Sequence, residues 1–304
     1  MITRHLLDAA LARSPAQALF RRRSRRRLTV LAYHAVTDAR RFERQLDLIA
    51  RVGRPVALDG VLAAAAGERE LPPAALLVTF DDGDRSVLEV ALPLLRERGI
   101  PAVVFVVAGF LDGDAPPWWR EAEGLAATGG TCSALPGRAG RHLVTALKRL
   151  PDEERRRALA ELRSTAGGAA PPEPQLRSED LATLEAAGME IGSHTLSHPC
   201  LPRCPDATVA EEIEGAHARL TAALGRPPRA FAYPNGDHDP RAEALLARLG
   251  YRAAFLFDHR PQPLPLTMPL RISRVRVNSS TEHDRFRIIL SGLHPALHHA
   301  MGRA

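Results

Sequence analysis

The stretch Val78-Thr79-Phe80-Asp81-Asp82-Gly83 decides the fold of this 304-residue chain. It ends an apolar run that begins at Ala74, which is the pattern of a buried strand in a parallel sheet. Such strands carry functional side chains at their carboxyl ends. Two adjacent carboxylates repel each other when both lose solvation, so we expect a bound cation or a division of roles between Asp81 and Asp82.

A second polar cluster, Gly192-Ser193-His194-Thr195-Leu196-Ser197-His198, follows a short apolar run at residues 189–192. Two imidazoles and one carboxylate, with one coordination position left open, form a catalytic zinc site. Cobalt, nickel and other divalent ions suit the same donors. We predict that Asp82, His194 and His198 bind a divalent metal, with zinc as the first choice. The alternative is a surface loop in which the two histidines have no ligand role.

Charge is distributed unevenly along the chain. Hydrophobic residues make up 45% and charged residues 25%, which is ordinary for a soluble globular protein. The formal net charge of +6 comes entirely from residues 1–27, which hold eight arginines and one acid, because the acids slightly outnumber the bases in the rest of the chain. A nucleic-acid groove needs basic charge spread over a folded face. We therefore expect no nucleic-acid partner.

Residues 1–27 are predicted to form a basic amino-terminal arm. Blocks of like charge tend to be disordered, so the arginines between Arg21 and Arg27 are first interpreted as a solvated lead-in. The alternative is a peripheral contact with an anionic membrane or a phosphate-bearing substrate, because residues 5–20 have some amphipathic helical character. We see neither a secretion-signal pattern nor a transmembrane stretch and expect a cytoplasmic protein, peripheral to the membrane if the arm binds lipid.

The three cysteines, Cys132, Cys200 and Cys204, are an odd number, which argues against a disulfide framework. The spacing of Cys200 and Cys204 beside His198 is compatible with a second metal site. No further cysteine pair completes such a site, so we interpret them as free thiols.

Short apolar runs alternate with helical patterns, which predicts a parallel α/β architecture. The expected strands are residues 28–34, 74–80, 101–108, 189–192, 230–233, 251–257 and 271–277. The clearest helical patterns are residues 39–52, 85–99, 178–188, 208–224 and 240–250. This alternation predicts a distorted (β/α) barrel of about seven strands over residues 28–277, followed by a carboxyl-terminal tail at residues 278–304.

Residues 110–175 break the alternation and predict an insertion after the third strand. They contain a charged helical pattern at residues 144–163 and the aromatic pair Trp118 and Trp119. The pair either stacks on a sugar ring or seats the insertion on the barrel.

Three ordered motifs, at residues 79–83, 193–198 and 229–236, together resemble those of the polysaccharide deacetylases (carbohydrate esterase family four). The resemblance covers residues 28–277. It implies a distorted (β/α) barrel, a divalent metal and hydrolysis of an N- or O-acetyl group on a sugar. It also implies that Asp81 is the base acting on a metal-bound water. The oxyanion and substrate would be bound at Tyr233, Pro234 and Asn235, with the backbone N–H of Asn235 as donor.

The chain departs from the family pattern at three functional positions. At Asn235 many members have a tyrosine, a change that a backbone donor tolerates. Ala232 stands where the family usually has an arginine that orients the base, and Arg274 or Arg276 is the candidate replacement. No histidine lies within residues 271–277 to act as the general acid. His34, at the end of the first predicted strand, is our candidate, because a histidine titrates near neutral pH. A general acid near the start of the chain resembles the exopolysaccharide-modifying branch of the family. The alternative is that His34 is a structural histidine beside the barrel mouth.

Three functions follow from these patterns. The first is a metal-dependent hydrolase that removes acetyl from an acetylated sugar or polysaccharide. The second is a catalytically impaired carbohydrate-binding protein of the same fold, which Ala232 and the displaced acid favour and the intact Asp81, Asp82, His194 and His198 oppose. The third is a membrane-surface interaction module that uses the arginine-rich arm.

Overall fold

The computed structural model of the chain describes residues 2–302. Residue 1 of the predicted arm and residues 303 and 304 of the predicted tail lie outside the described residues.

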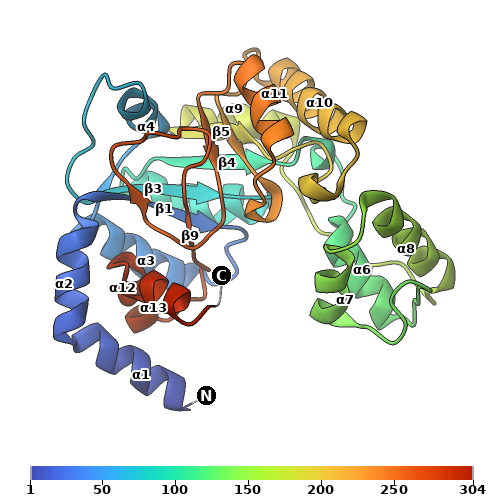
Figure 1. Cartoon of the computed structure of the whole chain (residues 1–304), viewed down its shortest axis with the longest axis horizontal. Helices are drawn as coiled ribbons and strands as arrows, with labels where there is room; N and C mark the ends of the chain where they lie inside the picture. Colours follow the sequence, from blue (N-terminus) through green and yellow to red (C-terminus); the bar gives the residue numbers. More distant parts are fainter. Residues whose placement is uncertain (1, 303–304) are drawn as a thin grey trace.

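The centre of the fold is a curled parallel sheet. Its strands lie in the spatial order β7-β6-β5-β4-β3-β1, and each neighbouring pair is parallel (Figure 1). All seven predicted strands contain strand residues, which confirms the predicted distorted (β/α) barrel. They are β1 (Arg27–Tyr33), β3 (Ala75–Phe80), β4 (Ala102–Val106), β5 (Met189–Ser193), β6 (Ala230–Ala232), β7 (Ala253–Phe255) and β9 (Val275–Arg276). The two-residue strands β2 (Arg54–Pro55) and β8 (Gln262–Pro263) lie against β3 and β1.

Residues 271–277 close the curled sheet. Ile272 exchanges backbone hydrogen bonds of 2.8 Å with Ala254 and Leu256 beside β7. Three residues later, β9 pairs in parallel with β1. One short segment therefore bridges the two ends of the run of strands. It also places Arg274 inside the barrel, where the residue has 0% exposure.

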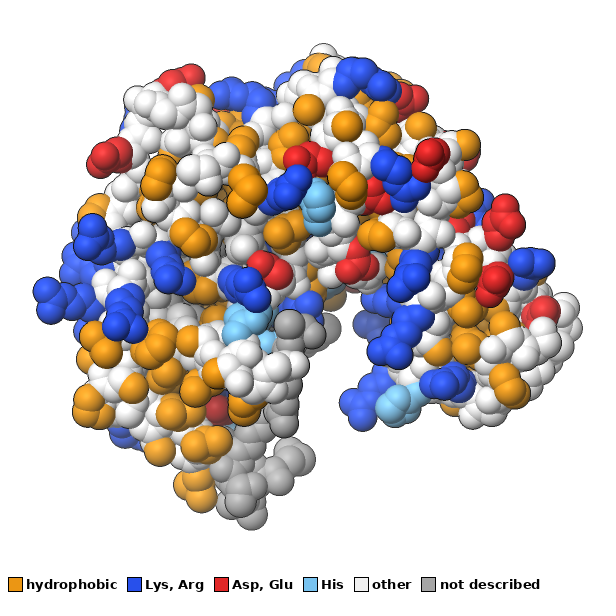
Figure 2. Space-filling model, in the orientation of Figure 1, with side chains coloured by type: hydrophobic (Ala, Val, Ile, Leu, Met, Phe, Trp, Pro, Cys, Tyr) orange, Lys and Arg blue, Asp and Glu red, His pale blue; other side chains and the backbone are white. Residues whose placement is uncertain are grey.

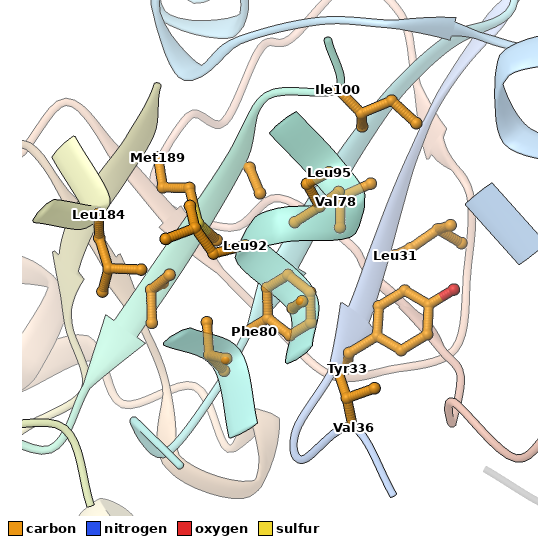
Figure 3. Close-up of a cluster of buried hydrophobic side chains, with 14 of the residues drawn as sticks. Leu31, Tyr33, Val36, Val78, Phe80, Leu92, Leu95, Ile100, Leu184 and Met189 are labelled. Atoms are coloured by element: carbon orange, nitrogen blue, oxygen red, sulfur yellow. The ribbon is translucent and has the colours of Figure 1, made fainter. Parts of the chain in front are cut away.

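The main core fills the space between the sheet and the helices on its outer face. Leu31, Tyr33 and Phe80 from β1 and β3 pack in one buried cluster with Leu92 and Leu95 from α5 (Leu92–Glu97) (Figure 3). Burial of such side chains contributes about 1.5–3 kcal/mol each. The sheet edge that carries Asp81 is held rigidly by this packing.

The helices flank the sheet largely as predicted. Helix α3 (Ala39–Val52) has the predicted bounds, and Asp239 accepts the backbone N–H groups at the start of α11 (Pro240–Arg248). The others are α4 (Leu58–Ala65), α9 (Ser178–Ala186) and α10 (Asp206–Leu224), with short 3₁₀ turns at Ala108–Phe110, Leu201–Arg203 and Pro234–Gly236.

Two predicted helices are interrupted at prolines. The single helix expected at residues 85–99 is a π-turn at Val87–Ala91 followed by α5. Pro93 lacks an N–H group, so the regular hydrogen-bond ladder is broken there. The helix expected at residues 144–163 is two helices, α7 (Gly140–Leu147) and α8 (Asp152–Thr165), with Pro151 at the junction.

Helices α7 and α8 pack with α6 (Trp118–Ala127) into a small lobe beside the sheet (Figure 1). The lobe has its own buried cluster, which includes Trp118, Leu143 and Leu159. It occupies the predicted insertion and lies beyond the carboxyl ends of the strands.

Both termini are more ordered than the sequence indicated. The basic arm forms α1 (Ile2–Arg13) and α2 (Pro15–Ser24), so the prediction of a disordered lead-in is wrong. Helices α12 (His283–Leu290) and α13 (Leu293–Ala300) form the predicted tail. Ala12 packs against Ile288 and Leu293, and Arg285 pairs with Asp8 at 2.8 Å. No helix among the described residues is both long and apolar enough to cross a membrane.

Candidate metal centre and active site

Asp82, His194 and His198 converge on one point at the carboxyl edge of the sheet. The Nε2 atoms of both histidines lie 3.6 Å from Oδ1 of Asp82. The three prospective ligand atoms all lie within 4.8 Å of one another. Asp82 follows β3, whereas the histidines follow β5. The curl of the sheet therefore brings together the side chains that the sequence singled out as metal ligands.

The imidazole of His194 is oriented by a backbone carbonyl. Its Nδ1 lies 2.7 Å from the oxygen of Ala232, which can only accept, so Nδ1 carries the proton and Nε2 presents a lone pair toward Asp82. A second partner of this kind is the usual support for a metal-binding histidine. Gly192, two residues earlier on β5, leaves room for the Phe105 ring, because a Cβ there would lie 2.5 Å from that ring.

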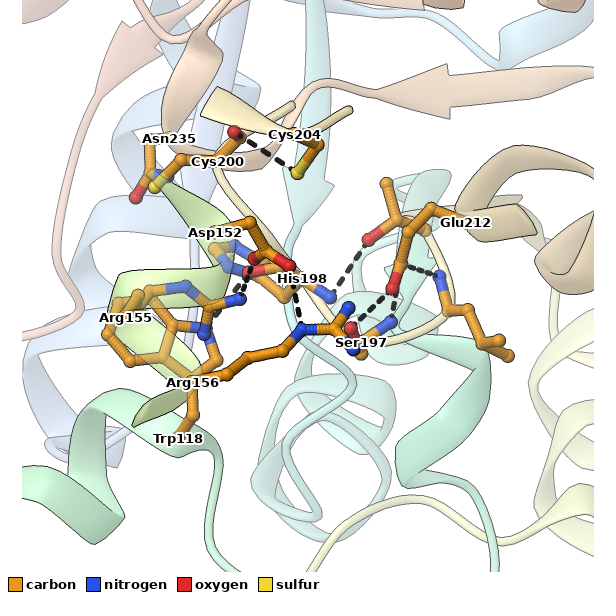
Figure 4. Close-up of polar contacts among 12 residues, drawn as sticks. Trp118, Asp152, Arg155, Arg156, Ser197, His198, Cys200, Cys204, Glu212 and Asn235 are labelled. Atoms are coloured by element: carbon orange, nitrogen blue, oxygen red, sulfur yellow. Dashed lines mark hydrogen bonds and ion pairs between the residues drawn. The ribbon is translucent and has the colours of Figure 1, made fainter. Parts of the chain in front are cut away.

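The loop that carries His198 is held by a buried carboxylate. Glu212 of α10 accepts hydrogen bonds from the backbone N–H groups of Leu196 and Ser197, at 2.9 and 2.8 Å, and from the Ser197 hydroxyl (Figure 4). Burial raises the pKa of Glu212. The indole of Trp118 donates to the backbone oxygen of His198 at 2.9 Å. The insertion thus helps to position a prospective ligand.

The polar atoms at this point fit a divalent metal. Oδ1 of Asp82 is buried and has no hydrogen-bond partner among residues 2–302. A buried acceptor without a donor is costly, and a cation satisfies it. Burial lowers the pKa of His194 and, more strongly, that of His198, so both imidazoles are neutral at pH 7 and able to donate a lone pair. Two neutral imidazoles and one carboxylate match the donor set of catalytic zinc.

Asp81, the neighbour of Asp82, is bound by an arginine instead. Its two carboxylate oxygens accept hydrogen bonds of 2.7 and 2.8 Å from the two terminal nitrogens of Arg274. Burial alone raises the pKa of Asp81, but Arg274, helped by His194, outweighs this effect and leaves the pKa below its usual value. Asp81 is 3% exposed, and its carboxylate is ionised at neutral pH.

Arg274 is itself fixed in place. Its Nε donates to the backbone oxygen of Leu256 at 2.6 Å, and one terminal nitrogen donates to the Thr79 hydroxyl at 3.1 Å. The guanidinium lies 5.4 Å from the Phe105 ring and 5.7 Å from the Phe257 ring. A planar guanidinium with two parallel hydrogen bonds sets both the position and the rotation of a carboxylate. Arg274 therefore supplies the orienting contact that Ala232 cannot.

The turn after β3 separates the two aspartates. Asp82 has a φ of +72°, a conformation that ordinary residues rarely adopt. Gly83 follows with a φ of +83°, and a Cβ there would lie 2.7 Å from Val106. This turn directs Asp81 toward Arg274 and Asp82 toward the histidines. The two adjacent carboxylates therefore have different partners, as expected from the sequence.

His34 lies at the mouth of the same site. Its side chain is 41% exposed, its Nε2 is 4.0 Å from Oδ2 of Asp82, and its ring packs against Phe257. The cavity, of about 280 Å³, is lined by His34, Asp81, Asp82, Trp119, Lys148, His194, His198, Asn235, Phe257 and Arg276. A histidine in this place can reach a bound substrate and solvent alike.

Of the predicted oxyanion segment, only Asn235 lines the cavity. It has a φ of +58°, and its side-chain amide donates to the Cys200 sulfur at 3.4 Å. Tyr233 is fully buried, and its hydroxyl donates to the oxygen of Leu270, away from the cavity. Pro234 is buried beside it. We correct the expectation for these two side chains: they support the turn that presents Asn235.

The cysteines behave as the sequence indicated. Cys132, Cys200 and Cys204 are buried and free. Burial raises the pKa of Cys204 to about 12 and raises the pKa of the other two thiols, so none is a thiolate at neutral pH.

The two tryptophans have different tasks. Trp118 is buried, and Arg155 of α8 lies over its ring at 4.6 Å, so it seats the insertion. Trp119 packs on His198, with ring centroids 4.4 Å apart, and lines a second cavity of about 280 Å³ next to the first. His34 and Asp82 line both cavities. The prospective metal centre therefore has space on two sides.

We expect the Glu212→Gln variant to bind metal about 10–100-fold more weakly, as is usual when a group supporting a ligand is lost. A glutamine offers one acceptor oxygen where the carboxylate offers two, so the 194–198 loop loses part of its anchor. Competition with a chromogenic chelator measures the affinity. Glu214→Gln, on the exposed face of the same helix, is the matched control. Equal metal affinity in Glu212→Gln and wild type would contradict this role.

Comparisons with known proteins agree with this geometry. Residues 68–254 match the polysaccharide deacetylase family. Chitin deacetylase 1 from Cryptococcus neoformans is 34% identical over 74 residues, which is 24% of this chain but only 16% of that protein.

Solved structures share the fold. IcaB from Ammonifex degensii aligns with a TM-score of 0.61 at 24% identity, covering 88% of this chain and 97% of that one. Streptococcus pyogenes deacetylase PplD, in complex with acetate, aligns with a TM-score of 0.61 at 17% identity, covering 87% and 98%. At these identities the likeness concerns the fold alone. Because the family match spans more than half of its residues, this chain belongs to the polysaccharide deacetylase family.

Proposed function

We propose that this chain is a metal-dependent hydrolase that removes the acetyl group from an N-acetylated sugar, with O-acetylated sugars as the chemically close alternative. One observation carries the proposal. An ionised carboxylate, Asp81, is held by Arg274 in the same cavity as the convergent Asp82, His194 and His198.

Asp82, His194 and His198 would hold the metal, for which we propose zinc from the donor set. When bound, such an ion supplies Lewis-acid activation of a water, so that even a carboxylate with a lowered pKa can accept its proton. Asp81 takes that proton, and Arg274 keeps its oxygens in one orientation throughout. The backbone N–H of Asn235 stabilises the negative charge that develops on the acetyl oxygen.

His34 is the proposed general acid that protonates the leaving amine. It faces Oδ2 of Asp82, whereas the buried histidines face Oδ1, and it is accessible to solvent, so it can be recharged with a proton after each turnover. Its place early in the chain also accords with the exopolysaccharide type. IcaB and the BpsB deacetylase domain from Bordetella bronchiseptica have the same fold, and we propose an acetylated polysaccharide as the substrate.

The two cavities that meet at Asp82 support a polymeric substrate. One contains Lys148 and Asn235, and the other contains Asn278 and Ser279, so sugar units on either side of the reacting one would each find polar groups. Trp119 lines both and offers an aromatic face to a sugar ring. The alternative of an impaired carbohydrate-binding protein rested on Ala232 and on the displaced general acid. Arg274 contacts Asp81 in place of the missing arginine, and we propose His34 as the acid.

A peripheral membrane contact is a second proposal, about partners. Leu6 and Leu7 on α1 are 66% and 59% exposed, and the following helix α2 carries Arg21, Arg22 and Arg23 in its last turn. Apolar side chains beside basic ones favour an anionic bilayer surface. Changing both leucines to glutamate should reduce cosedimentation with anionic vesicles; unchanged cosedimentation would refute the contact.

For His34→Ala we expect kcat to fall by about 10²–10⁴, the usual contribution of a general acid, with metal content unchanged. The side chain is partly exposed and makes no buried hydrogen bond within residues 2–302, so the fold should tolerate its removal. Single-turnover and steady-state rates on an N-acetylated oligosaccharide measure the effect. A rate equal to that of the wild type would exclude the acid role.

The proposed function is tested by acetate release. The full chain is incubated with N-acetylglucosamine oligomers and O-acetylated sugars, with and without a chelator. We expect acetate from at least one class, loss of activity with the chelator and recovery on adding zinc. Specific binding of the oligomers without acetate release would favour the impaired carbohydrate-binding protein instead.

A further inference from the structure

A separate cavity lies at the other end of the strands from the metal centre. Its volume is about 350 Å³, which is within the range of small-molecule sites. The amino ends of β1 and β3 form its floor. Helix α2, the carboxyl end of α3 and one side of α12, from His283 to Leu290, form its walls. None of its lining residues lines the metal cavity.

Every charged side chain in the lining is basic. Arg21 and Arg25 come from α2 and the residue after its end, Arg51 comes from α3, and Arg287 comes from α12. Arg287 pairs with Asp284 at 3.6 Å, but the other three have no carboxylate partner within residues 2–302. Figure 2 shows Lys and Arg side chains gathered where Figure 1 places α2. Unpaired cations around one hollow create a local positive potential.

Neutral donors complete the lining. Thr29 on β1 is only 5% exposed, and no residue within 2–302 hydrogen-bonds to its hydroxyl. Buried hydroxyls are normally hydrogen-bonded, so this one is available to a ligand. The Gln17 side-chain amide also lines the cavity without a partner within the same range. The Ser24 hydroxyl donates to the backbone oxygen of Ser291 at 2.6 Å and ties α2 to α12.

We propose that this cavity binds the phosphate group of an organic phosphate. Guanidinium groups recognise phosphate oxygens through paired hydrogen bonds, and several of them can surround one doubly charged group. The apolar side chains of Leu48, Leu76 and Leu290 line the same space and would contact the organic part of the ligand. The ligand is either a soluble phosphorylated molecule or a phospholipid headgroup. This site is independent of the proposed hydrolysis.

Helix dipoles offer a different explanation for the arginines. Helices α2, α3 and α12 all end at this cavity, and a cation near the carboxyl end of a helix stabilises that helix. That role accounts for one arginine at each end but requires no ligand. The two explanations differ in one measurement, because only the binding site makes phosphate affinity depend on these particular side chains.

The test titrates the full chain with pyrophosphate and with glycerol 3-phosphate by calorimetry at low ionic strength. The Arg25→Glu/Arg51→Glu variant changes two cavity arginines. The matched control, Arg22→Glu/Arg26→Glu, makes the same charge change at two exposed arginines outside the lining. We expect saturable binding that the cavity variant weakens at least about tenfold, since each charged hydrogen bond contributes about 1.5–3 kcal/mol. The control should retain most of the affinity.

Vesicles distinguish the source of the phosphate. Cosedimentation with phosphatidylcholine vesicles, with and without phosphatidylglycerol, is measured for the same three proteins. Binding to anionic vesicles that only the cavity variant loses would assign a headgroup; binding only to the soluble phosphates would assign a soluble ligand. Absence of saturable binding to any probe, or equal weakening by both variants, would overturn the proposal. Acetate release should be the same in all three proteins, which separates this outcome from failure of the proposed hydrolase.

Discussion

The kcat of an Asp81→Asn variant should be lower than that of wild type by a factor of at least about 10²–10⁴, while the variant keeps its metal. Asparagine matches aspartate in size but cannot accept the proton from the attacking water. The proposed metal ligands are Asp82, His194 and His198, and the turn with a φ of +72° at Asp82 directs that side chain away from its neighbour. Steady-state kinetics on an N-acetylated oligosaccharide, with metal analysis of the same preparation, measure both quantities.

The free energy of unfolding of Asp81→Asn must be measured as a control, to show that any loss of activity is not a loss of folding. Asp81 neutralises the buried Arg274, so asparagine leaves a buried cation without its counter-charge. A folded, metal-loaded and inactive Asp81→Asn protein supports the base assignment. A folded variant with the activity of the wild type would show that Asp81 is not the base.

An Arg274→Met variant should be destabilised by about 3–5 kcal/mol, the usual result of removing one partner of a buried ion pair. Methionine fills much of the volume but offers no hydrogen bonds to Asp81, Thr79 or Leu256. We also expect a large loss of kcat, because the base is no longer oriented. Chemical denaturation and steady-state kinetics measure the two effects.

The destabilisation in Arg274→Met should depend on pH. In the wild type, Arg274 holds the pKa of Asp81 below its usual value. The ion pair therefore stabilises the protein at pH values above the pKa that Asp81 has in the unfolded chain. This stabilisation is lost as pH falls through the pKa that Asp81 has in the folded protein. In the variant, burial acts unopposed and raises the pKa of Asp81, so the folded state favours the protonated acid. The difference in the free energy of unfolding between wild type and Arg274→Met should therefore become smaller as pH falls toward about 4.

A double mutant separates charge from packing. Adding Asp81→Asn to Arg274→Met removes the second buried charge, and it should recover part of the lost stability. If Asp81→Asn and Arg274→Met destabilise the protein additively, the two side chains are not coupled, and the pair does not hold the site as described.

The metal-centre residues could be predicted from the sequence because their signals are local. Asp82 follows an apolar run of strand length, and His194 and His198 follow another, so parallel strands bring them to one edge. The same reasoning located His34 at that edge, whereas Asn235 was assigned from the family resemblance. The prediction that the Tyr233 side chain binds substrate was wrong. Neighbouring side chains in a turn point in different directions, and the sequence does not show which of them face the cavity.

Arg274 and Glu212 could not be assigned in the same way. Arg274 binds a carboxylate 193 positions earlier in the chain. From the sequence, Arg274 and Arg276 were equally good candidates for this contact. The structure distinguishes them: Arg274 is inside the barrel, whereas Arg276 is exposed and donates to the backbone oxygen of Phe257. A glutamate on an amphipathic helix is ordinarily a solvated residue, so nothing local marked Glu212 as the support of the histidine loop.

The amino-terminal helices show the limit of reading charge alone. The arginine block indicated disorder, but α1 gains its order from long-range contacts with α12, including Asp8 with Arg285. Tertiary packing commonly overrides local tendency in this way. The same packing creates the basic cavity, which joins segments more than 230 positions apart.

The most direct test of the central claim is metal content after equilibrium dialysis against zinc. Wild type, Asp81→Asn and His194→Ala are dialysed together as full chains and analysed for bound zinc by mass spectrometry. The account predicts one zinc per chain in wild type and in Asp81→Asn, and little or none in His194→Ala. Equal zinc content in His194→Ala and wild type would contradict it.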